Sequence, residues 1–142
     1  MEIKPLITGE NLPFNAETNE TDIINRLGQP SEIEEYGKFG RFLHYDNLRF
    51  STFNKNLTGI DLFLINSNKS YEFPYDEDIF VINNKTPLLQ ILFLFNRIGL
   101  EWNIPYNNSK HDYLVIENGS NLKVFYYYEK MVLERISRFF QT

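Results

Sequence analysis

A short motif that occurs once in each half of the chain constrains its fold more than any other feature. Asn-Arg-Leu-Gly ends at Gly28, and Asn-Arg-Ile-Gly ends at Gly99. Both copies close an apolar-periodic segment, and glycine readily takes the left-handed conformation that terminates a helix. The sequence therefore predicts two helices at corresponding positions and, with them, an internal repeat.

The first predicted helix has polar residues where an N-cap is needed. Thr18 and Asn19 are both candidates, because a side-chain oxygen there can accept a hydrogen bond from the first helical turn. Ile23 and Leu27 lie on one side of the segment. We expect a short amphipathic helix that ends at Gly28.

The second predicted helix is apolar at almost every position. Thr86 is its expected N-cap, Pro87 its first residue and Ile98 its approximate end. The apolar run from Leu88 to Phe95 is far shorter than the roughly 20 residues that span a bilayer. Such a helix is expected to be buried and covered on nearly all sides.

Three strand-like segments follow each helix. They are rich in aromatic and β-branched residues, and Asn, Asp and Gly separate them as in hairpin turns. The segments are Arg41–Asp46, Leu48–Phe53, Gly59–Ile65, Tyr113–Glu117, Leu122–Tyr128 and Val132–Phe139.

The last strands of the two halves share one spacing. The matching residues are Leu57, Ile60 and Phe63 in the first half and Leu133, Ile136 and Phe139 in the second. We predict a single compact α+β domain over residues 1–142, built from two αβββ repeats at about 1–70 and 76–142. Their strands are expected to form one continuous antiparallel sheet with the helices on one face. Tyr71–Asp78 is the expected linker, and chance similarity of the short motifs is the alternative.

The first half also resembles a known repeat. Its helix runs into Leu-Gly-Gln-Pro at Pro30, and an aromatic strand reaches Tyr45. Leu-Arg-Phe follows at Phe50 and Leu-Thr-Gly-Ile at Ile60. This pattern resembles the repeat of the β-lactamase-inhibitor-protein-like fold, which the SmpA/OmlA outer-membrane lipoproteins share. The resemblance is looser in the second half, and it implies a fold more than a function.

The chain departs from those families in features tied to their location. The secreted inhibitors use disulfides and the lipoproteins have a lipid-anchored cysteine, whereas this chain has no cysteine. Its first residues also lack the pattern of a secretory signal. In style the chain resembles the small acidic immunity proteins that accompany bacterial polymorphic toxins. That resemblance implies a cytoplasmic, non-catalytic protein that binds one cognate toxin.

Charge and composition argue against several classes of function. The net charge is −5, and a nucleic-acid binder needs a basic surface. The absence of cysteine and the presence of two histidines remove thiol nucleophiles and most metal sites. We expect no catalytic residues, no metal, no cofactor, no nucleic acid and no membrane contact, and a free protein that is a monomer or a weak dimer.

The histidines do not make a convincing catalytic group. His44 lies among aromatic residues in a predicted strand, and no nucleophile is signalled nearby. Ser109, His111 and Asp112 share one polar loop, whereas catalytic triads converge from separate rigid elements. We expect His44 to be a packed or half-exposed strand residue.

Acidic residues concentrate in the first half of the chain. Residues 1–78 carry 14 acidic and 7 basic side chains, whereas residues 79–142 carry 5 and 7. Two acidic runs stand out, at Glu32–Glu35 and Glu72–Asp78. Three interpretations stay open for each: a metal site with oxygen ligands, a patch for a basic partner, or a solvated loop. An acidic surface suits the basic cleft of a nuclease toxin.

Aromatic and charged side chains alternate with aliphatic ones along the predicted strands. The aliphatic faces are expected to cover the helices, and the mixed faces to form the open side of the sheet. Exposed Tyr, Phe and Arg concentrate binding energy, although the second helix covering part of this side is the alternative. The predicted partner-binding residues are Glu32, Glu34, Glu35, Tyr36, Arg49, Phe53, Asp61, Phe63, Tyr71, Glu72, Tyr75, Asp76, Glu77, Asp78, Lys123, Phe125 and Tyr127.

These observations lead to one main hypothesis and two rivals. The main hypothesis is a protein-binding inhibitor, an immunity protein that occludes the active site of a cognate toxin. The first rival is an envelope or assembly scaffold of the SmpA/OmlA type, which requires export. The second is a small enzyme or ligand-binding α+β domain with a pocket around Trp102, Tyr106 and His111.

Overall fold

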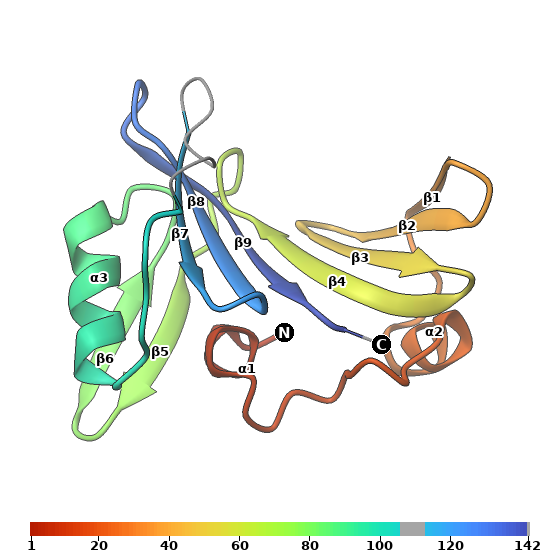
Figure 1. The fold of residues 1–142 in the computed structure, drawn as a ribbon, viewed down its shortest axis with the longest axis horizontal. Coiled ribbons are helices and arrows are strands. Elements are labelled where there is room, and N and C mark those ends of the chain that lie inside the picture. The colour runs from red at the N-terminus through yellow and green to blue at the C-terminus, as the bar shows by residue number, and fades with distance from the viewer. Residues whose placement is uncertain (106–112, 142) are drawn as a thin grey trace.

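The computed structural model describes residues 1–105 and 113–141, which form an α+β fold around a large antiparallel sheet (Figure 1). The predicted α+β class and antiparallel sheet are confirmed. The helices are α1 (Ile3–Thr8), α2 (Glu20–Leu27) and α3 (Leu88–Arg97). The strands are β1 (Glu32–Tyr36), β2 (Gly40–Tyr45), β3 (Leu48–Phe53), β4 (Asn56–Phe63), β5 (Tyr71–Tyr75), β6 (Asp78–Ile82), β7 (Tyr113–Asn118), β8 (Leu122–Tyr127) and β9 (Val132–Phe139).

The described strands form a seven-stranded sheet and a separate hairpin. The sheet order is β1-β2-β3-β4-β9-β8-β7, and β5 pairs with β6 alone. At the centre β4 and β9 pair antiparallel, with Asp61 opposite Ser137 and Leu62 opposite Ile136. The last strand of each half of the chain therefore meets the other in the middle of the sheet.

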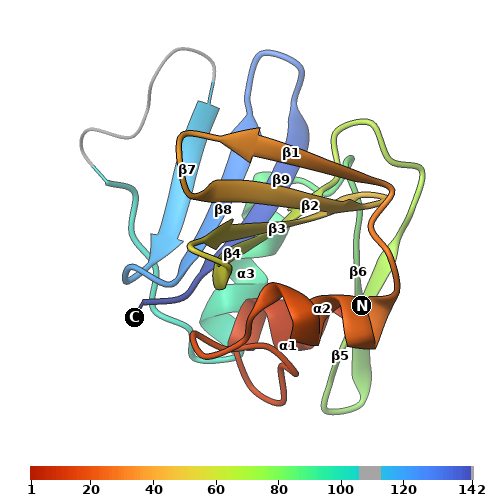
Figure 2. The same ribbon diagram turned by 90° about the vertical axis from the view of Figure 1, so that its right-hand side faces the viewer.

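One hydrophobic core unites the sheet, the hairpin and the helices. Phe50, Ile60 and Ile136 point into it from neighbouring strands, and α1, α2 and α3 contribute Ile7, Ile23 and Phe95. Figure 1 and Figure 2 show α1 and α2 below the curved sheet, and α1 is the one of the two that lies next to the β5–β6 hairpin. Because side chains alternate along a strand, the other face of the sheet carries a different set of residues.

The buried side chain of Arg138, in the last strand, binds the C-terminal end of α1. The sequence analysis did not predict this helix. Arg138 on β9 donates from Nε to the carbonyl of Leu6 and from Nη2 to that of Ile7, each at 2.5 Å. The last carbonyls of a helix lack intrahelical partners, and a cation suits that end of the helix dipole. Burial lowers the pKa of Arg138, and the two carbonyls are the groups that satisfy its charge.

The helix starts differ from expectation at one of two places. Asn19 caps α2 in a capping box with Asp22, so the second of the two candidates is correct. Thr18 instead accepts a hydrogen bond within the preceding turn. In α3 the expected cap is wrong, because Pro87 occupies the N-cap position and Thr86 bonds the turn before it.

The expectation that α3 is covered on almost all sides is also wrong. Ile91, Leu94 and Phe95 are buried, but Leu89 is 77% exposed and Phe93 is 59% exposed. The helix lies at the periphery of the molecule, beside the hairpin, and only one side of it reaches the core (Figure 1). Among the described residues, no helix combines the length and apolar character needed to cross a membrane.

The predicted linker Tyr71–Asp78 is an ordered hairpin. It supplies all of β5 and the start of β6, and its turn passes through Asp76 with a φ of 53°. Phe73 is buried in the core, and Tyr71 and Tyr75 pack against the core from alternate positions of the same strand. The period of two in Tyr-x-Phe-x-Tyr explains why the segment forms a strand.

The acidic run after α2 is also a strand. β1 pairs antiparallel with β2, from Glu32 opposite His44 to Tyr36 opposite Gly40. The first half therefore has four strands in the sheet rather than the three predicted. The residues of β1 are all exposed, as expected for an edge strand. Charged side chains at such an edge discourage pairing with further strands.

Candidate functional site

A row of polar side chains crosses all seven strands of the sheet on the face that points away from the core. Neighbouring members of the row are register partners, so their side chains share one face. From β1 to β7 the row is Glu32, His44, Arg49, Asp61, Ser137, Lys123 and Glu117. We call this side of the sheet, with the aromatic residues that flank the row, the polar face.

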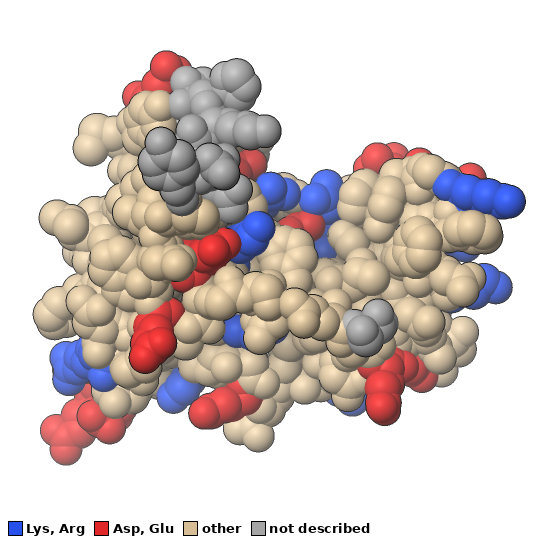
Figure 3. Space-filling model, viewed as in Figure 1, with Lys and Arg blue, Asp and Glu red and all other residues tan. Residues whose placement is uncertain are grey.

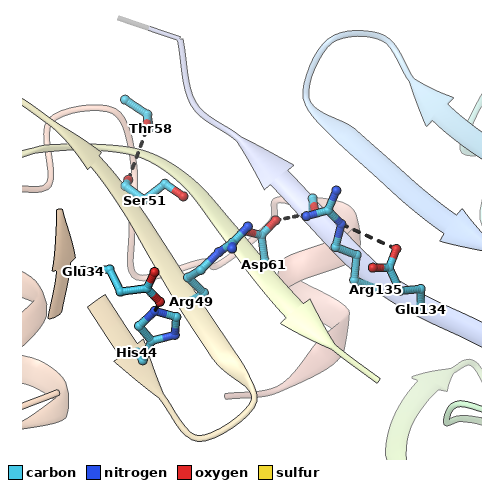
Figure 4. A network of polar contacts seen from close by, with 9 residues as sticks. Glu34, His44, Arg49, Ser51, Thr58, Asp61, Glu134 and Arg135 are labelled. Atoms are coloured by element: carbon cyan, nitrogen blue, oxygen red, sulfur yellow. Dashed lines mark hydrogen bonds and ion pairs between the residues drawn. The ribbon is translucent and has the colours of Figure 1, made fainter. Parts of the chain in front are cut away.

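The centre of the polar face is an ion pair that is held by a third residue. Arg49 donates from Nε and Nη2 to one oxygen of Asp61, at 3.0 and 2.8 Å. The other oxygen of Asp61 accepts from the hydroxyl of Ser137. These three residues lie on β3, β4 and β9, so the network joins the two halves of the chain (Figure 4).

Aromatic rings pack against Arg49 on either side of the ion pair. Its guanidinium carbon lies 4.2 Å from the ring centre of Phe42 and 4.9 Å from that of Phe63. Phe42 in turn stacks on Tyr36 at 4.2 Å. Cation–π contacts and the shared carboxylate together fix the position of the guanidinium.

A second arginine on the polar face has a different environment. The guanidinium carbon of Arg135 lies 4.0 Å from the ring centre of Phe125 and 5.9 Å from that of Phe63. Its nearest described carboxylate is Glu134, with 3.8 Å between Nε and Oε2. Burial raises the pKa of Glu134 above its ordinary value, although the adjacent Arg135 opposes that shift. The 3.8 Å contact between Arg135 and Glu134 is too long to be a hydrogen bond.

Two glutamates and a histidine meet at the β1 end of the row. The ligand atoms of Glu32, Glu34 and His44 lie within 4.8 Å of one another, and His44 Nε2 is 2.5 Å from Glu34 Oε1. The arrangement holds an ion pair when the imidazole is protonated, and these are also groups that bind transition metals. Among the described residues, no hydroxyl group hydrogen-bonds the imidazole, so a nucleophile–base pair is not assembled there.

Ten of the predicted partner-binding residues share the polar face. Register and strand alternation place them there from β1 through β8, on the side opposite the core. They are Glu32, Glu34, Tyr36, Arg49, Phe53, Asp61, Phe63, Lys123, Phe125 and Tyr127.

The other predicted residues lie elsewhere. Glu35 is the register partner of Arg41, whose Nε faces Glu20 of α2, so Glu35 is on the opposite side of the sheet. The remaining six belong to the β5–β6 hairpin, which pairs with neither edge of the seven-stranded sheet. They are Tyr71, Glu72, Tyr75, Asp76, Glu77 and Asp78.

The set of predicted partner-binding residues lacks several members of the polar face, although alternation had placed one of them, Arg135, on the open side of the sheet. Phe42, Ser137, Glu134 and Arg135 all contribute contacts there. The signal for Ser137 was present, because the matched spacing of the last strands aligns it with Asp61 in the first half. Strand alternation could not assign Glu134 to a face, because Glu134 is the extra residue of a bulge in the pairing of β8 with β9.

The pocket suggested around Trp102 is described only in part. Trp102 lines a hollow of about 590 Å³ together with Gly99 and Leu100, and its Nε1 donates to Asn96 at 2.8 Å. Tyr106 and His111, like Ser109 and Asp112, lie outside the described residues.

Both signs of charge are present on the polar face. Figure 3 shows Lys and Arg atoms next to Asp and Glu atoms in the hollow above the middle of the sheet. Two ion pairs on this face join residues of opposite charge, Arg49 with Asp61 and Arg135 with Glu134. The chain matches no protein-family model, no curated protein sequence and no solved structure.

Proposed function

We propose that this protein is a non-enzymatic inhibitor that binds one partner protein through the polar face. The partner is the cognate toxin of a bacterial competition system, and the protein acts in the cytoplasm as its immunity protein. The observation that carries the proposal is the set of half-exposed aromatic and arginine side chains on one face of a seven-stranded sheet. Tyr, Trp and Arg dominate the energetics of protein interfaces.

The rigidity of this face supports a binding role. Arg49 is held by Asp61, and Asp61 is held by Ser137, so their side chains are ordered before a partner arrives. Ordering a flexible side chain costs about 0.5–1.5 kcal/mol on binding. A face that is already ordered avoids part of that cost.

The two-repeat organisation belongs to the same proposal, with helices on one face of the sheet. Two observations support it. The spacing that matches the two halves aligns Asp61 with Ser137, and these two residues also face each other across β4 and β9. The same alignment matches Thr58 with Glu134, the extra residues of the two bulges in the sheet. Duplication followed by pairing about a local two-fold axis accounts for both.

Inhibition is proposed to be steric, with electrostatic guidance. A standard interface buries about 800 Å² on each partner, enough for the polar face to cover an active-site cleft. Residues 1–78 have a net charge of −7, and the exposed edge strand β1 contributes Glu32, Glu34 and Glu35. This surplus steers the protein towards a basic toxin surface.

The proposal is tested by capture followed by protection. The tagged protein is used to recover partners from its native host after a salt wash, and the recovered toxin domain is then expressed with and without the protein. Phe53→Glu places a charge on the polar face at a side chain that is 55% exposed. Phe93→Glu, at a 59% exposed position on α3, is the matched control.

We expect Phe53→Glu to abolish protection and Phe93→Glu to retain it. Equal protection by both variants would move the interface away from the polar face. Recovery of envelope-assembly proteins alone, or a toxin that remains active in the complex, would contradict the immunity role.

A further inference from the structure

Two arginines on the polar face differ in what their guanidinium groups contact. Arg49 donates two hydrogen bonds to Asp61. In the part of the chain that the structure describes, Arg135 donates no hydrogen bond, and its Nε is buried without a hydrogen-bond acceptor. The two side chains are similarly exposed, at 23% and 25%, so exposure does not explain the difference.

The surroundings of Arg135 hold the guanidinium against aromatic rings without a direct hydrogen bond to a carboxylate. Phe125 lies under it at 4.0 Å and Phe63 beside it at 5.9 Å. Glu134 contacts it only at 3.8 Å, a separation at which no direct hydrogen bond forms. An arginine stacked on an aromatic ring still presents its planar N–H edge to a second group.

The row across the sheet carries charges of both signs, with Glu117 opposite Lys123 and Glu134 beside Arg135. Its β1 end carries Glu32 and Glu34, whereas Lys123 and Arg135 lie on β8 and β9. Lys123 has the carboxylate residue Glu117 as its register partner, whereas Arg135 has its nearest described carboxylate at 3.8 Å. An acidic group of a partner is therefore the complement of the Arg135 guanidinium.

We propose that Arg135 is the docking point for a carboxylate of the partner protein. An Asp or Glu side chain of the partner accepts hydrogen bonds from the guanidinium edge while Phe125 and Phe63 shield the pair from water. The inference rests on the proposed function, because it names the chemistry that the partner offers to the polar face. It also orients the partner, with its basic surface over β1 and its carboxylate over β9.

The first experiment needs no partner. The ¹⁵N-labelled protein is titrated with glutarate, a dicarboxylate, at constant ionic strength, and the arginine Nε–Hε signals are followed by NMR. Neutral glutaramide is the matched control ligand. We expect the Arg135 signal to shift in a saturable way, the Arg49 signal to stay because its acceptor is already in place, and glutaramide to shift neither.

A substitution at Arg135 distinguishes the contribution of the planar guanidinium group from that of its positive charge. Arg135→Lys keeps the positive charge but loses the planar fork, and it is expected to weaken glutarate binding about tenfold, the loss of one charge-assisted hydrogen bond. Arg26→Gln is the control, because Arg26 also faces an aromatic ring, Phe14 at 5.9 Å, but lies on α2 below the sheet. No saturable shift at Arg135, or equal shifts at Arg26 and Arg49, would overturn the carboxylate site.

The second experiment distinguishes this inference from the function on which it rests. The affinity of the captured toxin domain is measured for the native protein and for Arg135→Lys. A saturable glutarate site in a protein that binds no toxin would refute the immunity role and keep the carboxylate site. Toxin binding that Phe53→Glu abolishes and Arg135→Lys leaves unchanged would refute the carboxylate contact and keep the function.

Discussion

The two faces of the seven-stranded sheet are built by different rules, as two phenylalanines of β3 show. Phe50 is fully buried and contacts Phe14 and Tyr45 on the core side, whereas Phe53 is 55% exposed and contacts Phe39 at the rim of the polar face. On the core side the fit of apolar volume decides which residue is tolerated. On the polar face the partners are charges and rings, so stability and binding can be changed separately.

The sharpest test of this contrast is the pair Phe50→Ala and Phe53→Ala. Phe50→Ala leaves a cavity in the core and is expected to lower the free energy of unfolding by about 3–5 kcal/mol. Phe53→Ala removes a half-solvated ring and is expected to change it by less than about 0.5 kcal/mol. Urea unfolding followed by circular dichroism measures both. Similar losses in the two variants would mean that the faces are not distinct.

The next largest effect is expected within the polar face itself. Asp61 is buried and holds both Arg49 and Ser137. Asp61→Ala leaves Arg49 half-buried without its carboxylate, which is expected to cost about 2–3 kcal/mol. Asp61→Ala in the background of Arg49→Leu should recover part of that loss. A double variant that is no more stable than Asp61→Ala would show that the ion pair is not the source of the cost.

Gly40→Ala tests how closely the aromatic residues of the polar face are packed. A Cβ atom at Gly40 would lie 2.2 Å from a ring carbon of Tyr36. The ring would have to leave its stack on Phe42 and its hydrogen bond to the carbonyl of Thr52. We expect a loss of about 1–2 kcal/mol in thermal unfolding. Gly59→Ala, whose Cβ would meet its nearest neighbour at 3.4 Å, is expected to cost less.

The smallest expected effect is a pH dependence due to Glu134. Burial raises its pKa above the ordinary value of 4.5, so the folded state binds a proton more tightly than the unfolded state. The stabilising contribution is therefore present below pH 4.5 and lost as the pH rises through the folded-state pKa. Glu134→Gln should be slightly more stable than the native protein above that window, because the partly solvated carboxylate is no longer held in a buried site. A difference that does not vary with pH would contradict the assignment.

Much of the sheet could be predicted from the sequence because its strands alternate strongly. The expected bounds Leu48–Phe53 and Val132–Phe139 agree with β3 and β9. Alternation also assigned Arg49, Phe63 and Phe125 to one side of the sheet, which the register confirms. Strong period-two patterns with turn residues between them are the most reliable local signal.

The elements that were missed or misassigned depend on contacts that local patterns do not encode. β1 contains three glutamates, and its pairing is fixed by the β2 strand beside it. α1 is six residues long, and Arg138 from the other end of the chain completes it. The contact between Arg135 and Phe125 requires the pairing of β8 with β9 across a bulge. Each of these features depends on tertiary contacts. The sequence therefore predicted which residues share the polar face, but not the contacts that these residues make.

The anchoring of α1 by Arg138 has a consequence for how the protein is made. The helix leaves the ribosome before β9 does, and its last carbonyls lack their arginine donor until a residue 132 positions later has been added. The central pairing of β4 with β9 waits for the same stretch. Contacts between such distant segments slow folding, and a nascent chain without β9 exposes both a strand edge and a helix end. We therefore expect stable folding to require completion of β9, and nascent chains that end before Arg138 to be readily degraded by proteases.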